Sequence, residues 1–155
     1  MKKLLAIGAV FLALAACAGE TRPIEAAAAP GDPGGQAYLK ECSACHMAYP
    51  PQFLPARSWQ ALSGGLAHHF GEDASLDPAQ TERVTAYLVA NAADSPSGDP
   101  GVLRGLAPGE TPIRITDLPF WRNRHHRLLR PGVGEGPGLR TAANCASCHN
   151  GRGDD

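Results

Sequence analysis

The sequence is short of methionine, of aromatic side chains and of charge. Of its 155 residues, 2 are methionines, 6 % are aromatic and 19 % are charged. It also lacks an apolar run that could span a bilayer, because the run over residues 4–16 has only 13 members and a spanning helix needs about 20. Its 18 glycines and 14 prolines leave a domain of this size little apolar side chain to bury. We therefore expect a compact protein whose core is completed by something besides its own side chains.

The N-terminal apolar run has the length and the flanks of an export signal. It follows Lys2 and Lys3 and ends in Leu-Ala-Ala just before Cys17. These features predict a secretory signal peptide over residues 1–16. The Leu-Ala-Ala-Cys ending resembles a bacterial lipobox, so we expect Cys17 to become the lipidated first residue; ordinary cleavage within Ala-Cys-Ala is the alternative. Both routes lead to the periplasm, and residues 17–35, rich in Ala, Gly and Pro, are expected to form a flexible tether.

Four of the five cysteines lie in two Cys-x-x-Cys-His pentapeptides, residues 42–46 and 145–149. This is the attachment pattern of c-type haem: two thiols one helical turn apart add to the vinyl groups, and the adjacent histidine lies under the iron. A redox dithiol or half a zinc site also begins Cys-x-x-Cys, but two copies ending in histidine behind an export signal favour two covalently bound haem c groups. The predicted thioether residues are Cys42, Cys45, Cys145 and Cys148, and the predicted proximal iron ligands are His46 and His149.

Each iron then needs a sixth ligand, and for the first haem we predict His69. Ser58 is the expected N-cap of a helix that reaches Phe70. One face of that helix carries a 3–4–3 pattern of Trp59, Leu62, Leu66 and His69. His68 points to the opposite side and is the fallback ligand. The glycines at 64 and 65 would let a flat porphyrin approach the backbone.

The same pattern recurs in the second half and predicts His125 as the ligand of the second haem. A helix is expected to start near Pro119, capped by Thr116 or Asp117. Its apolar face comprises Leu118, Trp121, His125 and Leu128. His126 lies off this face and is the fallback ligand.

The other signals indicate a mostly α-helical protein in two parts. The motifs are expected on helices over residues 35–48 and 139–149. Asp-Pro-Ala-Gln at 77–80 is a strong helix start, for a helix reaching about Ala92. Because residues 94–109 are rich in Ser, Pro, Gly and Asp, we predict an N-terminal haem domain over 36–100 and a C-terminal one over 101–155.

The scarcity of methionine bears on the redox chemistry. Met1 is lost with the signal peptide. Met47 lies beside a proximal histidine and is badly placed to reach the opposite face of that haem. The alternative is that Met47 ligates the other haem. We therefore predict two bis-histidine irons, with lower potentials than a His/Met cytochrome c. Six-coordinate irons have no open position, so electron transfer is the expected function, and a small dihaem peroxidase or reductase with one open iron is the alternative. A third class is a redox-sensing or structural haem subunit of a membrane complex.

Charge is unevenly divided along the chain. Residues 17–103 hold 4 Lys/Arg and 10 Asp/Glu, whereas residues 104–140 hold 7 Arg and 3 acids. This is either an ordinary solvated surface, with some arginines pairing with haem propionates, or a polarised molecule that steers redox partners. The basic region is too short to indicate nucleic-acid binding.

Longer stretches of the sequence resemble one family. They are residues 42–46, 49–51 (Tyr-Pro-Pro), 54–59 (Leu-Pro-Ala-Arg-Ser-Trp), 69–74 (His-Phe-Gly-Glu-Asp-Ala) and 144–149, with Leu66, Arg114-Ile115-Thr116, Phe120-Trp121 and His125 between them. Together they resemble the bacterial dihaem cytochrome c family, whose members donate electrons to the sphaeroides haem protein, a small oxygen-binding monohaem cytochrome. The resemblance implies a class I-like first haem domain, a less usual second one, and bis-histidine ligation through His69 and His125. It also implies a membrane b-type cytochrome as the electron source.

Overall fold

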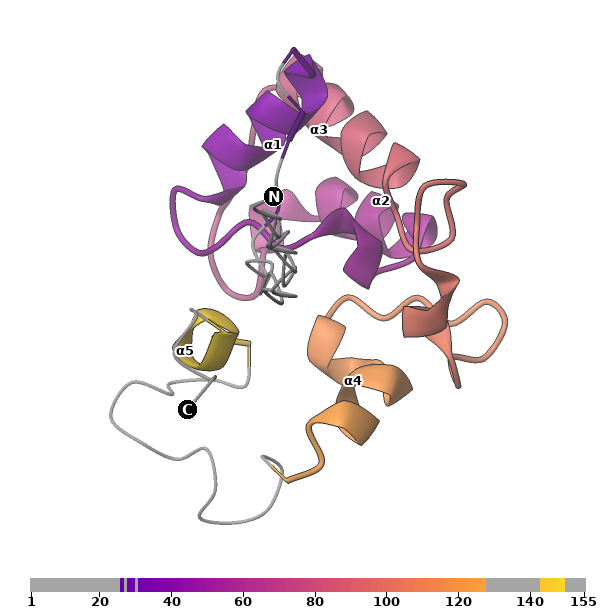
Figure 1. The fold of residues 1–155 in the computed structure, drawn as a ribbon. Helices are drawn as coiled ribbons and strands as arrows, with labels where there is room; N and C mark the ends of the chain where they lie inside the picture. Colours follow the sequence, from indigo (N-terminus) through magenta and orange to yellow (C-terminus); the bar gives the residue numbers. More distant parts are fainter. Residues whose placement is uncertain (1–25, 27, 30, 128–142, 150–155) are drawn as a thin grey trace, which may run out of the picture.

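The computed structural model describes residue 26, residues 28–29, residues 31–127 and residues 143–149 (Figure 1). In this part of the chain the structure is helical, and its one β feature is an isolated bridge between His69 and Glu72. The α-helices are α1 (Pro33–Cys42), α2 (Ala56–Gly64), α3 (Pro78–Ala90), α4 (Pro119–Arg124) and α5 (Ala146–His149). Short 3-10 turns are η1 (Pro51–Phe53), η2 (Leu66–His68), η3 (Pro100–Leu103) and η4 (Ile115–Asp117). None of these helices is long and apolar enough to cross a membrane. The expectation of a mostly α-helical fold is confirmed.

Helix α1 begins inside the segment that was expected to be a tether. The Asp32 carboxylate caps it by accepting the N–H groups of Gly34 and Gly35, at 3.0 and 3.1 Å. Upstream, Ala26 is buried and donates its N–H to the carbonyl of Ala48 at 2.9 Å. The predicted tether over 17–35 is therefore too long at its C-terminal end, and its earlier part lies outside the described residues. Helix α1 also ends at Cys42, so the helix predicted to Ala48 is wrong beyond that point.

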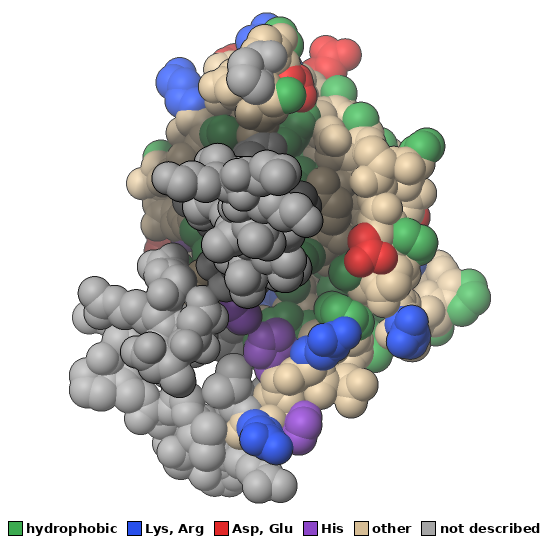
Figure 2. Space-filling view, in the orientation of Figure 1, with side chains coloured by type: hydrophobic (Ala, Val, Ile, Leu, Met, Phe, Trp, Pro, Cys, Tyr) green, Lys and Arg blue, Asp and Glu red, His purple; other side chains and the backbone are tan. Residues whose placement is uncertain are grey.

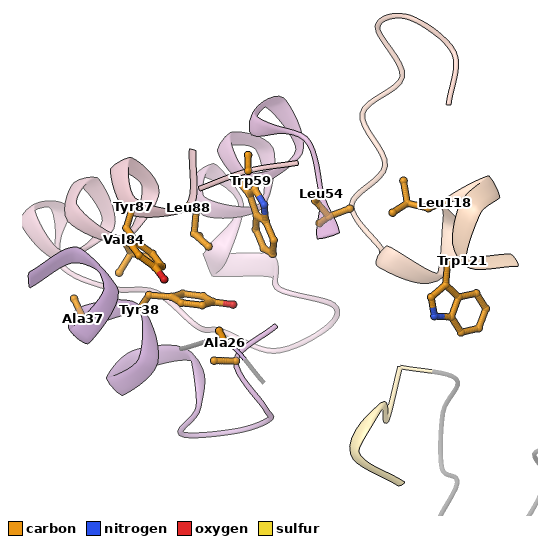
Figure 3. Close-up of a cluster of buried hydrophobic side chains, with 12 residues drawn as sticks. Ala26, Ala37, Tyr38, Leu54, Trp59, Val84, Tyr87, Leu88, Leu118 and Trp121 are labelled. Atoms are coloured by element: carbon orange, nitrogen blue, oxygen red, sulfur yellow. The ribbon is translucent and has the colours of Figure 1, made fainter. Parts of the chain in front are cut away.

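Helix α3 lies against α1 and supplies much of the core. Its start is as predicted, because the Asp77 carboxylate accepts the N–H of Gln80 at 3.0 Å, and the helix ends at Ala90. The side chains of Val84 and Leu88 are buried there beside Tyr38 of α1 (Figure 3). Residues as small as Gly34 are needed at the crossing, since a Cβ at that position would come within 2.9 Å of the Tyr87 Cβ.

Helix α2 differs from the prediction at both ends. It starts at Ala56 rather than after Ser58, and the carboxylate that accepts the Ala56 N–H, at 2.7 Å, belongs to Asp94. Ser58 lies within the helix and is fully buried. The helix ends at Gly64 because the Gly-Gly pair is a poor helix interior, and η2 follows. A continuous helix to Phe70 was therefore a wrong prediction.

The second half packs beside this core through Leu118 and Trp121 (Figure 3). Helix α4 starts at Pro119 as expected, but its N-cap position is taken by buried Leu118, and neither Thr116 nor Asp117 caps it. Both of those residues belong to η4 instead. Helix α4 ends at Arg124, so His125 follows it rather than lying within it.

Helix α5 carries the second motif and is shorter than predicted. It covers Ala146–His149, and residues 143–145 before it are not helical. Residues 139–142 of the predicted helix, the apolar Leu128 and the whole segment 1–25 with Cys17 lie outside the described residues. In Figure 1, α5 and α4 lie below the group formed by α1, α2 and α3. The predicted domain division within 94–109 stays a prediction.

Candidate haem-binding site

A cavity of about 650 Å³ opens between these two groups of helices. Its volume is in the range of cofactor and ligand pockets. One wall carries the first motif through Cys42, Cys45 and His46, and the cavity continues as far as Ala143 and Cys145 beside the second motif. The remaining lining is largely aliphatic and aromatic, and includes Leu54, Trp59, Leu62, Leu66, Leu76, Val84 and Leu88. A large apolar group such as a porphyrin fits this lining.

Cys42, the first thiol of the first motif, is partly buried. The pKa of Cys42 is raised to about 11, chiefly by burial and also by the negative charges of Glu41 and Cys45. A redox-active dithiol has a lowered thiol pKa instead. In addition, the described residues hold no cluster of three or more His, Cys, Asp or Glu side chains that would bind a bare metal ion. The environment of Cys42 therefore favours covalent haem attachment over a redox dithiol.

His46 faces His69 across the first part of the cavity. Their ring centroids are 6.2 Å apart and their planes are within 18° of parallel. The Nδ1 atom of His46 lies 2.6 Å from the carbonyl oxygen of Met47. Donation of the Nδ1 hydrogen to that oxygen leaves the Nε2 lone pair free for a metal, the arrangement usual for metal-bound histidine.

His69 lies in the cavity because the chain turns sharply after η2. Its N–H and C=O pair with Glu72 at 2.8 and 3.1 Å, across a turn in which Phe70 and Gly71 have φ angles of 54° and 103°. Burial, followed by the charge of His46, lowers the pKa of His69, which favours the neutral form that binds metals. The neighbouring His68 is exposed and lies outside the cavity lining.

A second pair is formed by His125 and His149. Their ring centroids are 6.1 Å apart, and the ring planes are inclined by 76°. His125 stacks on Trp121, with a centroid distance of 4.4 Å, and its Nδ1 lies 2.9 Å from the Trp121 carbonyl oxygen, which again leaves Nε2 free. His126 is exposed, and its Nδ1 lies 3.0 Å from the carbonyl oxygen of Asn123.

Both distances match one iron held between two imidazoles. Two metal–nitrogen bonds of about 2 Å each, plus the distance from nitrogen to ring centre on both sides, give a centroid separation of roughly 6 Å. Each pair joins the histidine of one motif to a histidine far away in the sequence. The residues present therefore fit two haem groups. The side chain of Cys148 lies outside what the structure describes.

Two further residues of the cavity were given no role from the sequence. The guanidinium of Arg114 lies 4.0 Å from the centre of the Phe70 ring, which in turn meets the His69 ring edge-on at 4.8 Å. Tyr49 packs on His46, with ring centroids 5.2 Å apart. Both lie in stretches that resemble the family, but their contacts join distant segments of the chain, so no local pattern gave them a role. Figure 2 shows histidine side chains near the centre of one face, close to Lys or Arg side chains.

A small helical protein with two Cys-x-x-Cys-His motifs, each facing a second histidine, has the fold and the site of a c-type cytochrome with two haems. The sequence profile of the dihaem cytochrome c family matches residues 38–154, and the chain belongs to that family. It accordingly carries two covalently bound haem c groups, as predicted from the motifs.

Solved structures agree with this assignment. The chain is similar to a dihaem cytochrome c from Rhodobacter sphaeroides, with 52 % identity, 75 % of this chain and 90 % of that chain covered, and a TM-score of 0.68. A second structure, of the protein purified from Rhodobacter sphaeroides, gives 47 % identity, the same coverage of 75 % and 90 %, and a TM-score of 0.61. A dihaem cytochrome c from Shewanella baltica OS155 gives 36 % identity, 76 % and 82 % coverage, and a TM-score of 0.60. A search of curated protein sequences found no match.

Proposed function

We propose that this protein is an electron carrier whose two irons are each held by two histidines. The observation that carries the proposal is the two pairs of imidazoles, whose ring centroids are 6.2 Å and 6.1 Å apart. In each pair one histidine has its Nδ1 within hydrogen-bond distance of a backbone carbonyl oxygen. The proposed axial ligands are His46 with His69 and His125 with His149, and the proposed thioether residues are Cys42, Cys45, Cys145 and Cys148. Each haem supplies an iron that accepts and releases one electron.

The protein's own residues determine what that iron does. With both axial positions filled by imidazole, oxygen and peroxide have no free position, which favours electron transfer over catalysis. Two nitrogen ligands, rather than one nitrogen and a methionine sulfur, favour the ferric state and a low potential. The largely apolar lining of the cavity gives the first site an environment of low polarity.

Electron paramagnetic resonance of the oxidised protein, with and without cyanide, tests this function. We expect two low-spin ferric signals that cyanide leaves unchanged, because cyanide would have to displace an imidazole. A high-spin signal that cyanide converts to low-spin would show an open iron and would replace the carrier by a small peroxidase or reductase. Reduction by dithionite before peroxide addition would then measure that activity.

We also propose that the carrier works in the periplasm, between a membrane b-type cytochrome and a small oxygen-binding monohaem cytochrome. Support comes from the export signal, the family resemblance, and the contrast between an acidic first part and a basic segment over 104–140. Electrostatic steering of this kind should weaken with ionic strength. Electron exchange with either partner should therefore slow as salt rises.

Membrane anchoring through Cys17 is proposed from the lipobox-like ending alone. We expect mass spectrometry of the mature protein to find Cys17 as its N-terminal residue, carrying a diacylglycerol and an acyl chain. Cys17→Ser should move the protein from the membrane fraction to the soluble periplasmic fraction without changing its haem content. An unmodified Cys17 inside the mature chain would remove the lipoprotein assignment and leave ordinary signal cleavage.

A further inference from the structure

Tyr49 connects the two haem sites. It follows the first motif by three residues, and its hydroxyl donates a hydrogen bond of 2.8 Å to the carbonyl oxygen of Ala143, 94 residues further along the chain. Its ring lies 5.2 Å from the His46 ring, at an inclination of 30°. One side chain therefore touches the proximal histidine of the first site and the segment that leads into the second motif.

The Ala143 carbonyl continues this connection to the second site. The same oxygen accepts the backbone N–H of Cys145 at 2.9 Å and lies 3.5 Å from the Cys145 sulfur. Cys145 is the first proposed thioether residue of the second motif. A short series of contacts thus runs from the His46 imidazole through the Tyr49 ring and hydroxyl to the Ala143 carbonyl and on to Cys145.

Tyr49 is held in place from the other side. Its carbonyl accepts the hydroxyl of Tyr38 at 2.6 Å, and Tyr38 is buried in α1 with its ring 5.7 Å from that of Tyr87. Ala48 before it is fully buried, and the two prolines after it restrict the backbone. Contacts within the first half of the chain therefore hold the Tyr49 backbone, while its hydroxyl reaches the second half through Ala143.

We propose that Tyr49 is a positioning residue for electron exchange between the two haems. Its hydroxyl holds the segment before the second motif, at Ala143, against the first haem site, where its ring packs on His46. The contact between the two sites is thus made of covalent bonds and one hydrogen bond. Electronic coupling falls off more slowly through bonds and hydrogen bonds than across a gap, so this contact raises the exchange rate. One electron leaves the ferrous iron of one haem and reduces the ferric iron of the other, and no bond breaks. The proposal rests on the electron-carrier function proposed above.

The test is the rate at which one added electron redistributes in the holoprotein. Pulse radiolysis supplies one electron per molecule, and rapid freezing followed by paramagnetic resonance reports which ferric signal has been lost. Tyr49→Phe keeps the ring and removes the hydroxyl, and we expect it to slow redistribution several-fold. Tyr49→Leu also removes the contact with His46 and should slow it further. Tyr87→Phe, which removes a phenol hydroxyl elsewhere in the core, is the matched control and should behave like the wild type.

The midpoint potentials and low-spin signals of each variant separate positioning from other roles. We expect both to stay as in the wild type in Tyr49→Phe, since the ring that packs on His46 is kept and only the hydroxyl is lost. An unchanged redistribution rate in Tyr49→Phe would overturn the proposal, as would altered axial-ligand signals, because they would show that the residue shapes the first haem instead. If even the wild type shows no redistribution of the electron, the proposed carrier function is wrong, and this result is distinct from an effect that is missing only in the Tyr49 variants.

Discussion

His69→Ala should convert the first haem from low-spin to high-spin and open it to cyanide, whereas His68→Ala should leave both haems low-spin. His69 lines the cavity with its ring 6.2 Å from His46, while His68 is exposed beyond the lining. Removing the imidazole leaves the iron with one protein axial ligand. One of the two low-spin signals is therefore lost in the first variant, and neither in the second.

The second site should respond in the same way to a change at His125. His125→Ala should remove the other low-spin signal, and the neighbouring His126→Ala is its matched control. Added imidazole should restore the low-spin state in His69→Ala and His125→Ala, because each substitution leaves a space shaped for that ring. Low-spin haems throughout in both variants would show that the ligand assignment is wrong.

The parts of this protein that local chemistry determines were predictable from the sequence. Covalent haem attachment needs two cysteines and a histidine at fixed spacing. The motifs at 42–46 and 145–149 therefore predicted two haem groups without any knowledge of the fold. The start of α3 was equally visible, because Asp77 and the proline after it form a cap within four residues, and the Asp77 carboxylate does accept the Gln80 N–H.

Features that depend on distant segments were not predictable. Ser58 is a good N-cap residue, yet α2 begins three residues earlier than a Ser58 cap would place it, because Asp94, from beyond α3, accepts the Ala56 N–H. Helical periodicity led to His69, but the helix ends at Gly64, and a turn with positive φ at Phe70 brings the histidine to the cavity. The periodicity therefore led to a residue that does line the cavity, although the helix on which the argument depended ends before that residue.

The relative orientation of the ligand rings also could not be predicted from the sequence. It has a large expected effect on the paramagnetic resonance signals of the two haems. The rings of His46 and His69 are inclined by 18°, and those of His125 and His149 by 76°. Two iron d orbitals can each overlap with the π system of an axial imidazole. Two parallel imidazoles both act on the same one of these orbitals, so the two orbitals differ in energy. Two perpendicular imidazoles act on one orbital each, so the two orbitals have nearly the same energy. We therefore expect one rhombic low-spin signal from the first haem and one highly anisotropic signal from the second.

The variants that remove single ligands assign these signals. His69→Ala should remove the rhombic signal and His125→Ala the highly anisotropic one, whereas two signals of the same type would contradict the ring geometry.

The orientation of His125 is imposed by Trp121, which stacks on it at 4.4 Å and accepts its Nδ1 hydrogen through the backbone carbonyl. Trp121→Leu keeps that carbonyl but removes the stacking surface. Because the ring then loses the surface that fixes its plane and is restrained by the carbonyl alone, the second signal should broaden or shift towards the rhombic type, while the signal of the first haem stays unchanged.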